Sequence, residues 1–216
     1  MRQLRPALIG LLVLLLYTCK SSTEEEQRPW PDQRLSRWLS YYEVTMDDFE
    51  KSGQFLRTYP VEREFSPSEA GVFQNLFVYS PDSSLAIDLD SYHLILDINE
   101  DGELYSPGRE VDMEVGLINL SNGKRERLLF CGTICLFEEA TFQTDSHIVV
   151  AGFTENSRGY HPTLWTINTN LDSLEIYKTP AVIKPEAIRY TAEERLDHIN
   201  FRHSTPPSDK GLDNPL

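Results

Sequence analysis

The chain has 216 residues and a formal net charge of −14, with 20 Lys and Arg against 34 Asp and Glu. This length allows one domain, or two small ones, with a real hydrophobic core. The acidic balance argues against nucleic acid as a partner, because binding phosphates requires clustered Lys and Arg. It suits a cationic partner or a divalent metal better, although a merely soluble surface explains it equally well.

The first 26 residues have the features of an export signal followed by a polar segment. Arg2 and Arg5 precede an apolar run over residues 7–17, and Cys19 follows this run. A membrane-spanning helix needs roughly 20 apolar residues, and the run has about half that length. The pattern therefore predicts a signal peptide over residues 1–18.

The segment Leu16-Tyr17-Thr18-Cys19 resembles the cleavage site of bacterial lipoprotein signals, in which a Leu three positions before an invariant cysteine marks the cut. Leu16 and Cys19 match, whereas Tyr17 and Thr18 depart from the small residues that this family prefers. The resemblance implies that Cys19 becomes the acylated N-terminus of a protein anchored in the bacterial cell envelope, at the outer membrane, on its periplasmic or surface face. An uncleaved anchor and an ordinary secretory cut are the alternatives.

Removing residues 1–18 from the 216 leaves 198 residues, and the loss of two arginines takes the charge from −14 to −16. Residues 19–29 are polar and have no hydrophobic period, so we expect a flexible tether there. The acidic residues 24–26 resemble a stretch that accompanies export to the outer face of the outer membrane in some lipoproteins. A solvated tether without any address is the alternative.

A helical pattern extends from Pro31 to Leu56. Leu35, Trp38, Leu39 and Tyr42 recur at i, i+3, i+4 and i+7, and Pro31 suits a first turn. A second short helix is predicted after Thr45, with Asp47 and Asp48 in its first turn and Met46 and Phe49 facing inward.

Strand signals dominate from about Val61 to Tyr177. Clusters of Gly, Pro, Asn, Asp and Ser predict turns between strand-like runs. The turn clusters cover residues 80–84, 99–102, 106–108, 121–123 and 156–159, and the strand-like runs include residues 84–89, 92–96, 113–120 and 147–153.

The β region contains a weak internal repeat, because residues 77–88 align with 141–152 and residues 115–124 align with 164–173. These units resemble blades of a β-propeller, where Ser-Pro-Asp opens a strand and a hairpin closes the blade. A closed propeller usually needs about four or more blades, so two units cannot close a ring. We therefore expect a mainly β domain, an antiparallel sheet that is partial-propeller-like or sandwich-like, with short N- and C-terminal helices.

The C-terminal part predicts short helices again. Lys184-Pro185 opens one, and residues 191–194 have the Thr-x-x-Glu pattern of a capping box ahead of Leu196 and Ile199. Residues 204–216 are rich in Pro, Ser and Asp and predict a frayed tail. One mainly β domain is thus expected over residues 30–203.

Cys131 and Cys135 are the two cysteines that remain once Cys19 is acylated. In an oxidising compartment two cysteines this close tend to pair. A disulfide requires Cα atoms about 4.4–6.8 Å apart, whereas four extended residues span roughly 13 Å, so the segment has to turn, with Gly132 as a suitable pivot. We expect a disulfide-clipped loop between two strands, with free thiols as the main alternative.

The segment Asp97-Ile-Asn99-Glu-Asp101-Gly102 matches the opening of a calcium-binding loop, in which alternate oxygens converge on a hard cation. The match then fails, since Gly108 stands where an EF-hand supplies its bidentate Glu and Glu110 comes two residues later. An ordinary hairpin turn is the favoured interpretation. The alternative is a Ca²⁺ site using Asp97, Asn99, Asp101 and Glu110, with Asp112 as a further candidate; no other cofactor is indicated.

Catalytic motifs are not apparent in the sequence. The five histidines, at positions 93, 147, 161, 198 and 203, are scattered, and the large aromatics Trp30, Trp38, Tyr160 and Trp165 suit a core better than a binding platform. We expect a lipid-anchored envelope protein that acts as a binding or structural module without catalysis. Its expected partner is another protein of the envelope. The alternative is an exported hydrolase whose carboxylates one sequence cannot pair.

Overall fold

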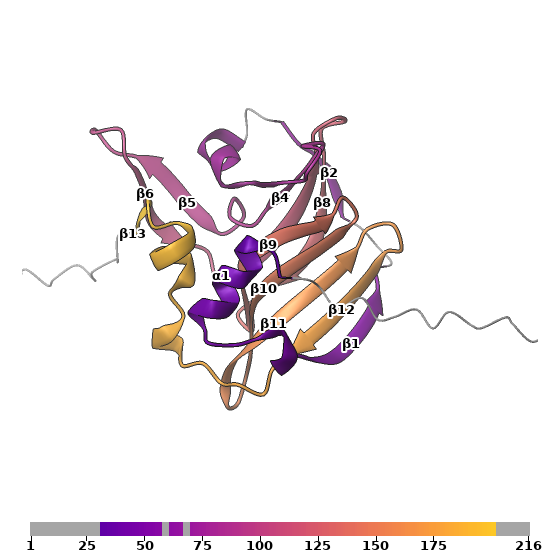
Figure 1. Ribbon diagram of the computed structural model, residues 1–216. Helices are drawn as coiled ribbons and strands as arrows, with labels where there is room; N and C mark the ends of the chain where they lie inside the picture. Colours follow the sequence, from indigo (N-terminus) through magenta and orange to yellow (C-terminus); the bar gives the residue numbers. More distant parts are fainter. Residues whose placement is uncertain (1–30, 58–60, 67–69, 202–216) are drawn as a thin grey trace, which may run out of the picture.

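The computed structural model describes residues 31–57, 61–66 and 70–201. The predicted signal peptide, the tether, Cys19, Trp30, His203 and the tail over 204–216 lie outside these residues. Within them the protein is mainly β, with three sheets and a few short helices (Figure 1). The predicted fold class is therefore confirmed.

Helix α1 covers Gln33–Tyr41, where the apolar period predicts it. Leu35, Trp38 and Leu39 form its buried face, and Asp32 caps its start by accepting a hydrogen bond from the Leu35 N–H at 2.9 Å. A 3₁₀ turn follows at Met46–Asp48, in which the Asp48 carboxylate accepts a hydrogen bond from the Thr45 N–H at 2.7 Å.

The prediction that the helical pattern continues to Leu56 is wrong, because Glu50–Leu56 forms strand β1. β1 pairs antiparallel with β12, Ser173–Lys178, and contains a bulge between Lys51 and Gly53. The pairing supplies backbone partners from a strand more than a hundred residues away, and a local pattern cannot reveal such a partner.

Two five-stranded sheets form the body of the domain. Sheet A has the order β1-β12-β11-β10-β9, and sheet B has the order β2-β8-β7-β4-β3. The remaining strands of sheet A are β9 Cys135–Thr144, β10 His147–Asn156 and β11 Gly159–Asn168. Those of sheet B are β2 Glu62–Glu64, β3 Val78–Tyr79, β4 Leu85–Asp88, β7 Met113–Asn119 and β8 Lys124–Cys131.

The two aligned units of the sequence occupy corresponding places in these sheets. Each sheet contains four strands that follow one another from one edge, and each receives its fifth strand from the N-terminal part of the chain. The turns correspond as well: the side-chain oxygens of Asn119 and Asn168 each accept hydrogen bonds from the backbone N–H groups two and three residues later. Sheet B differs by an insertion between β4 and β7.

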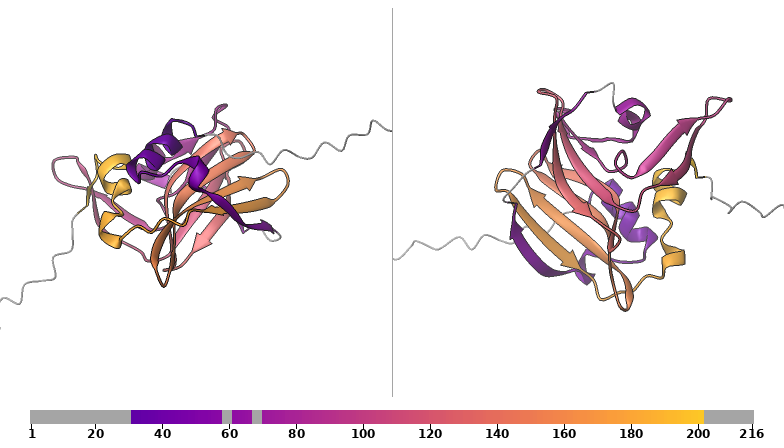
Figure 2. Two further views of the ribbon diagram at one scale, coloured as in Figure 1. Left: turned by 60° about the horizontal axis from the view of Figure 1, so that its bottom comes forward. Right: turned by 180° about the vertical axis from the view of Figure 1, so that it is seen from behind.

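This insertion is the hairpin of β5, Leu94–Ile98, and β6, Leu104–Arg109, which projects from the body (Figures 1 and 2). With β13, Asn200–Phe201, it forms sheet C in the order β13-β6-β5. The turn predicted at residues 106–108 is wrong, because these residues belong to β6. A β-bulge explains why these residues have the composition of a turn. The register shifts between Ile95 and Asp97, opposite Pro107, and bulges tolerate proline.

The core has two main parts, one on each face of sheet A. Sheets A and B pack face to face around apolar residues of both, including Ile87, Val115, Ile148 and Trp165. On the opposite face of sheet A, α1 and the C-terminal segment pack against residues of β10, β11 and β12. Figure 2 shows this order of layers from two further sides. Trp38 and Trp165 are core residues, as the sequence predicts.

The C-terminal segment contains a 3₁₀ turn at Pro185–Ala187 and a π-helical turn at Thr191–Arg195. The helix start at Pro185 is confirmed. The capping box at residues 191–194 is wrong, because Tyr190 holds the cap position without a side-chain cap bond. The Thr191 hydroxyl instead donates to Glu138 at 3.4 Å, so a tertiary contact replaces the local one.

Substituting Gly152→Ala is expected to destabilise the domain by about 1–3 kcal/mol. A Cβ at this position would lie 2.9 Å from the carbonyl carbon of Leu136 and 3.0 Å from the Cα of Phe137, and closest of all to the Leu136 carbonyl oxygen. These are backbone atoms of β9, so the strand itself has to move. Urea unfolding followed by circular dichroism measures the loss.

Gly108→Ala is the matched control, because its Cβ would meet only the Ile95 Cδ1, at 4.0 Å. We expect this variant to stay within about 0.5 kcal/mol of the wild type. Equal losses for the two variants would contradict the steric explanation.

Candidate functional site

Two consecutive glutamates of β9 lie beneath α1 and the C-terminal segment. In the pairing of β9 with β10, Ala151 faces Glu139 and Gly152 faces Phe137, so Glu138 is the extra residue of a β-bulge. Without a bulge, neighbouring side chains of a strand point to opposite faces. Here both glutamates contact the α1 side, and Glu138 is 4% and Glu139 1% exposed.

Glu138 receives hydrogen bonds from two residues one helical turn apart. The indole N–H of Trp38 and the hydroxyl of Tyr42 donate to its Oε2 at 3.0 and 2.7 Å, and the Thr191 hydroxyl donates to Oε1 at 3.4 Å. Burial raises the pKa of Glu138, and these hydrogen bonds oppose the rise only in part. The carboxyl therefore binds its proton more tightly than an exposed glutamate does.

Glu139 is held by a different set of donors. Its Oε2 accepts a hydrogen bond from the Tyr190 hydroxyl at 2.7 Å, and its Oε1 accepts from the Ala140 N–H at 3.0 Å and from Arg34 at 3.4 Å. Burial, and after it the charge of Glu139, raises the pKa of Tyr190. Tyr190 therefore remains a hydrogen-bond donor throughout the ordinary pH range.

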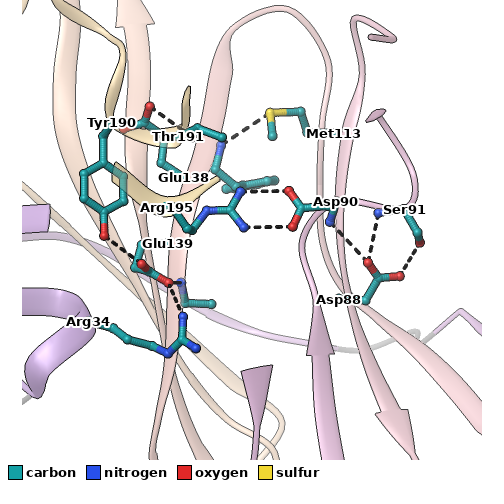
Figure 3. Close-up of polar contacts among 12 residues, drawn as sticks. Arg34, Asp88, Asp90, Ser91, Met113, Glu138, Glu139, Tyr190, Thr191 and Arg195 are labelled. Carbon is teal, nitrogen blue, oxygen red and sulfur yellow. Dashed lines mark hydrogen bonds and ion pairs between the residues drawn. The ribbon is translucent and has the colours of Figure 1, made fainter. Parts of the chain in front are cut away.

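A third buried carboxylate, Asp90, lies in the turn between β4 and β5. Both of its oxygens accept hydrogen bonds from the guanidinium of Arg195, at 2.8 and 2.7 Å, and the side chains are 2% and 5% exposed. Asp88 supports this turn by accepting hydrogen bonds from the N–H groups of Asp90 and Ser91. Figure 3 shows Arg195 lying between Asp90 and the two glutamates.

We call Asp90, Glu138, Glu139 and Arg195 the buried acidic centre. It places three carboxylates and one guanidinium in the interior, with Arg34 at its edge. Each carboxylate accepts hydrogen bonds from the chain itself, and the side-chain donors come from α1, from Tyr42 directly after it and from the C-terminal segment. The centre therefore joins α1, sheet A, the β4–β5 turn and the C-terminal segment through charge-assisted hydrogen bonds.

The residues predicted for a cation site lie along the β5–β6 hairpin. Asp97 accepts a hydrogen bond from the Tyr105 hydroxyl at 3.2 Å, and the Asn99 side-chain oxygen accepts from the N–H groups of Asp101 and Glu103. Glu110 lies at the other end of the hairpin, where its N–H donates to the carbonyl of residue 93.

Asp112 follows shortly after Glu110, away from the turn. The described part of the chain has no group of three or more His, Cys, Asp or Glu side chains arranged to hold a metal ion. Asp97 still belongs to β5, and residues 99–102 form the hairpin turn, where Gly102 has a φ of 83°.

A disulfide joins Cys131 to Cys135, with Cα atoms 6.0 Å apart. The bridge connects the end of β8 to the start of β9, so it closes the crossover from sheet B to sheet A. Both cysteines are buried, whereas Ile134 at the loop tip is exposed. The geometry is that of a clip between two strands.

The histidines are dispersed among the described residues. His93 and His161 are buried, His147 bonds to Asn168 at 2.9 Å, and His198 lies exposed beside Asp197. The sequence interpretation did not single out the buried acidic centre. Two adjacent glutamates inside the apolar segment over 135–142 were the available signal, because a strand core rarely contains charged residues without partners.

Two shallow grooves lie elsewhere on the described surface. One is lined by residues 102–104 and 197–200, and the other by Tyr92 and residues 110–112. No helix of the described residues has the length and apolar character needed to cross a membrane. Comparison with known proteins found no matching family model, no matching curated protein and no matching solved structure.

Proposed function

We propose that the protein is a lipid-anchored protein of the bacterial cell envelope whose β domain acts as a binding or structural module without catalysis. The observation that carries the non-catalytic part is the buried acidic centre. Its three carboxylates accept hydrogen bonds from Trp38, Tyr42, Tyr190, Thr191, Arg34 and Arg195. These hydrogen bonds hold α1 and the C-terminal segment against sheet A, and they occupy the oxygens of the three carboxylates.

The anchoring part of the proposal rests on Cys19 and the signal before it. Two or three acyl chains hold a protein firmly at a membrane, because each buried methylene contributes about 0.8 kcal/mol. Asp32, the cap residue, is thirteen positions after Cys19, and thirteen steps of about 3.5 Å each can reach up to ~45 Å. The domain could therefore meet an envelope protein partner at some distance from the bilayer.

Cys19→Ser is expected to abolish membrane attachment and normal processing. Wild-type protein should partition into the detergent phase and have the mass of residues 19–216 plus acyl chains, because acylation requires the thiol. The variant should remain unacylated. Phase partitioning combined with intact-protein mass spectrometry provides both readouts.

Cys131→Ser is a useful control, because it removes a different cysteine and leaves the signal unchanged; this variant should still be acylated. If the Cys19→Ser variant partitions into membranes like the wild type and has the same processed mass, lipidation at Cys19 is refuted.

The absence of catalysis is tested separately. A catalytic activity that is present in the wild type and lost in a folded Glu138→Gln variant would refute the non-catalytic proposal and favour an exported hydrolase.

A further inference from the structure

The C-terminal segment over residues 185–201, here called the strap, joins parts of the domain that are far apart in the sequence. Tyr190 and Thr191 contact the glutamates of β9, and Arg195 binds Asp90 of the β4–β5 turn. Leu196 and Ile199 then pack against Leu94, and β13 pairs in parallel with β6. Figures 1 and 2 show the strap running from the α1 side of sheet A to the β5–β6 hairpin.

His93 is a buried imidazole in the β4–β5 turn, directly before Leu94, which packs against Leu196 and Ile199 of the strap. Its exposed fraction is 5%, and its Nδ1 has no hydrogen-bond partner within the described residues. Protonating the imidazole makes both ring nitrogens donors, so it would leave a buried N–H group at Nδ1 without an acceptor and add a buried positive charge.

The charges around His93 do not favour a second cation. Arg195 of the strap and Arg109 of β6 both act on it unfavourably, and Asp90 acts favourably. Asp90 already binds the guanidinium of Arg195 through both oxygens. Glu138 and Glu139 of β9 act on Arg195 and are not among the groups that act most strongly on His93. Burial is the largest influence, and it lowers the pKa of His93 to about 4.

We propose that the strap is an acid-released latch and that His93 is its proton sensor. With the strap open, His93 is solvated, and its pKa returns to about 6.5. The imidazole of His93 therefore binds a proton more tightly in the open form than in the closed form. Through this linkage the opening constant of the strap rises as the pH falls below 6.5, by up to tenfold per pH unit, to about 160-fold at pH 4 and about 300-fold at still lower pH.

Glu138 acts in the opposite sense and has to be separated in the experiment. Its pKa is raised while the strap is closed, so opening the strap releases a proton in the range where the closed carboxyl is still protonated. Falling pH therefore strengthens closure through Glu138 and weakens it through His93. The contribution of His93 appears only as a difference between variants that share Glu138.

Hydrogen exchange by mass spectrometry tests the proposal on the protein as extracted from membranes. Exchange of peptides covering residues 188–201 is compared at pH 7 to 4.5 in wild type and His93→Gln, after correction for intrinsic exchange rates. The ratio of opening constants, wild type over variant, should rise about sevenfold per pH unit between pH 6 and pH 4.5. His198→Gln, an exposed histidine of the same strap, should reproduce the wild-type dependence.

A ratio that stays constant with pH would overturn the proposal. So would strap peptides that open together with peptides of β10 at every pH, because release would then be global unfolding. If His93→Gln fails to fold, NMR titration of the wild-type imidazole decides. A pKa near 6.5 with the strap protected contradicts the mechanism, and a value near 4 supports it.

Discussion

Arg125→Met is expected to destabilise the domain by about 3–5 kcal/mol, because it leaves two buried carboxylates without their common cation. Arg125 lies on β8 with its side chain 2% exposed. Its guanidinium contacts Asp88 at 3.2 Å and also pairs with Glu114. The side chain of Asp88 is 2% exposed and that of Glu114 is 4% exposed. Gly116 of β7 has no side chain where this guanidinium lies, so the site is built for a large cation.

Urea unfolding at several pH values measures this loss. Burial raises the pKa of Glu114, but hydrogen bonds and charges from Arg125 and Arg127 outweigh burial and lower it below its ordinary 4.5. A carboxylate with a lowered folded pKa contributes stability above pH 4.5, and the contribution is lost as the pH falls through the folded pKa. The deficit of Arg125→Met should therefore be largest near neutral pH and shrink below pH 4.5.

Lys124→Met is the matched control on the same strand. Lys124 pairs with Glu62 at 3.3 Å, and both side chains are 52% exposed, so its loss should cost only about 0–1 kcal/mol. If the two variants lose equal stability, or if the Arg125→Met deficit does not change with pH, the buried ion pairs do not contribute the stability that we attribute to them.

Trp38→Ala is expected to cost about 3–5 kcal/mol, since it removes the largest side chain of the α1 interface and leaves a cavity. Trp38 is fully buried. Its ring lies 5.3 Å from Tyr42 and 5.7 Å from Phe153, centroid to centroid, and its N–H donates to Glu138. Thermal and urea unfolding measure the loss.

Trp38→Phe separates packing from hydrogen bonding. It keeps most of the aromatic packing and removes the donor to Glu138, so we expect a smaller loss of about 1–3 kcal/mol. Ser40→Ala changes an exposed position of α1 and should stay within about 0.5 kcal/mol of the wild type. Full stability of Trp38→Phe would mean that the indole N–H contributes nothing to holding Glu138.

Local patterns predicted the parts of the fold whose partners are near in the sequence. The apolar face of α1 follows from the spacing of Leu35, Trp38 and Leu39, and the turn at residues 121–123 follows from the side chain of Asn119, which bonds its own backbone. The same reasoning failed at β1 and at residues 106–108. In both places strand pairing with bulges overrides local preference.

The candidate site depended on contacts that no local pattern contains. Trp38 and Glu138 are 100 residues apart, and Arg195 and Asp90 are 105 apart. A glutamate pair in the sequence is compatible with a solvated strand edge as well as with a buried centre. The bulge at Glu138 decides between them, because it directs both side chains toward α1 and the strap.

The sequence by itself determined the apolar period of α1, most of the strands and turns between β3 and β12, and the mainly β class, because these depend on side chains acting on their own stretch of backbone. Only the tertiary structure decided that Glu138, Glu139, Asp90 and Arg195 lie together inside the protein. Burying a charge is costly unless partners surround it, and those partners are assembled only when α1, β9, the β4–β5 turn and the strap pack against one another.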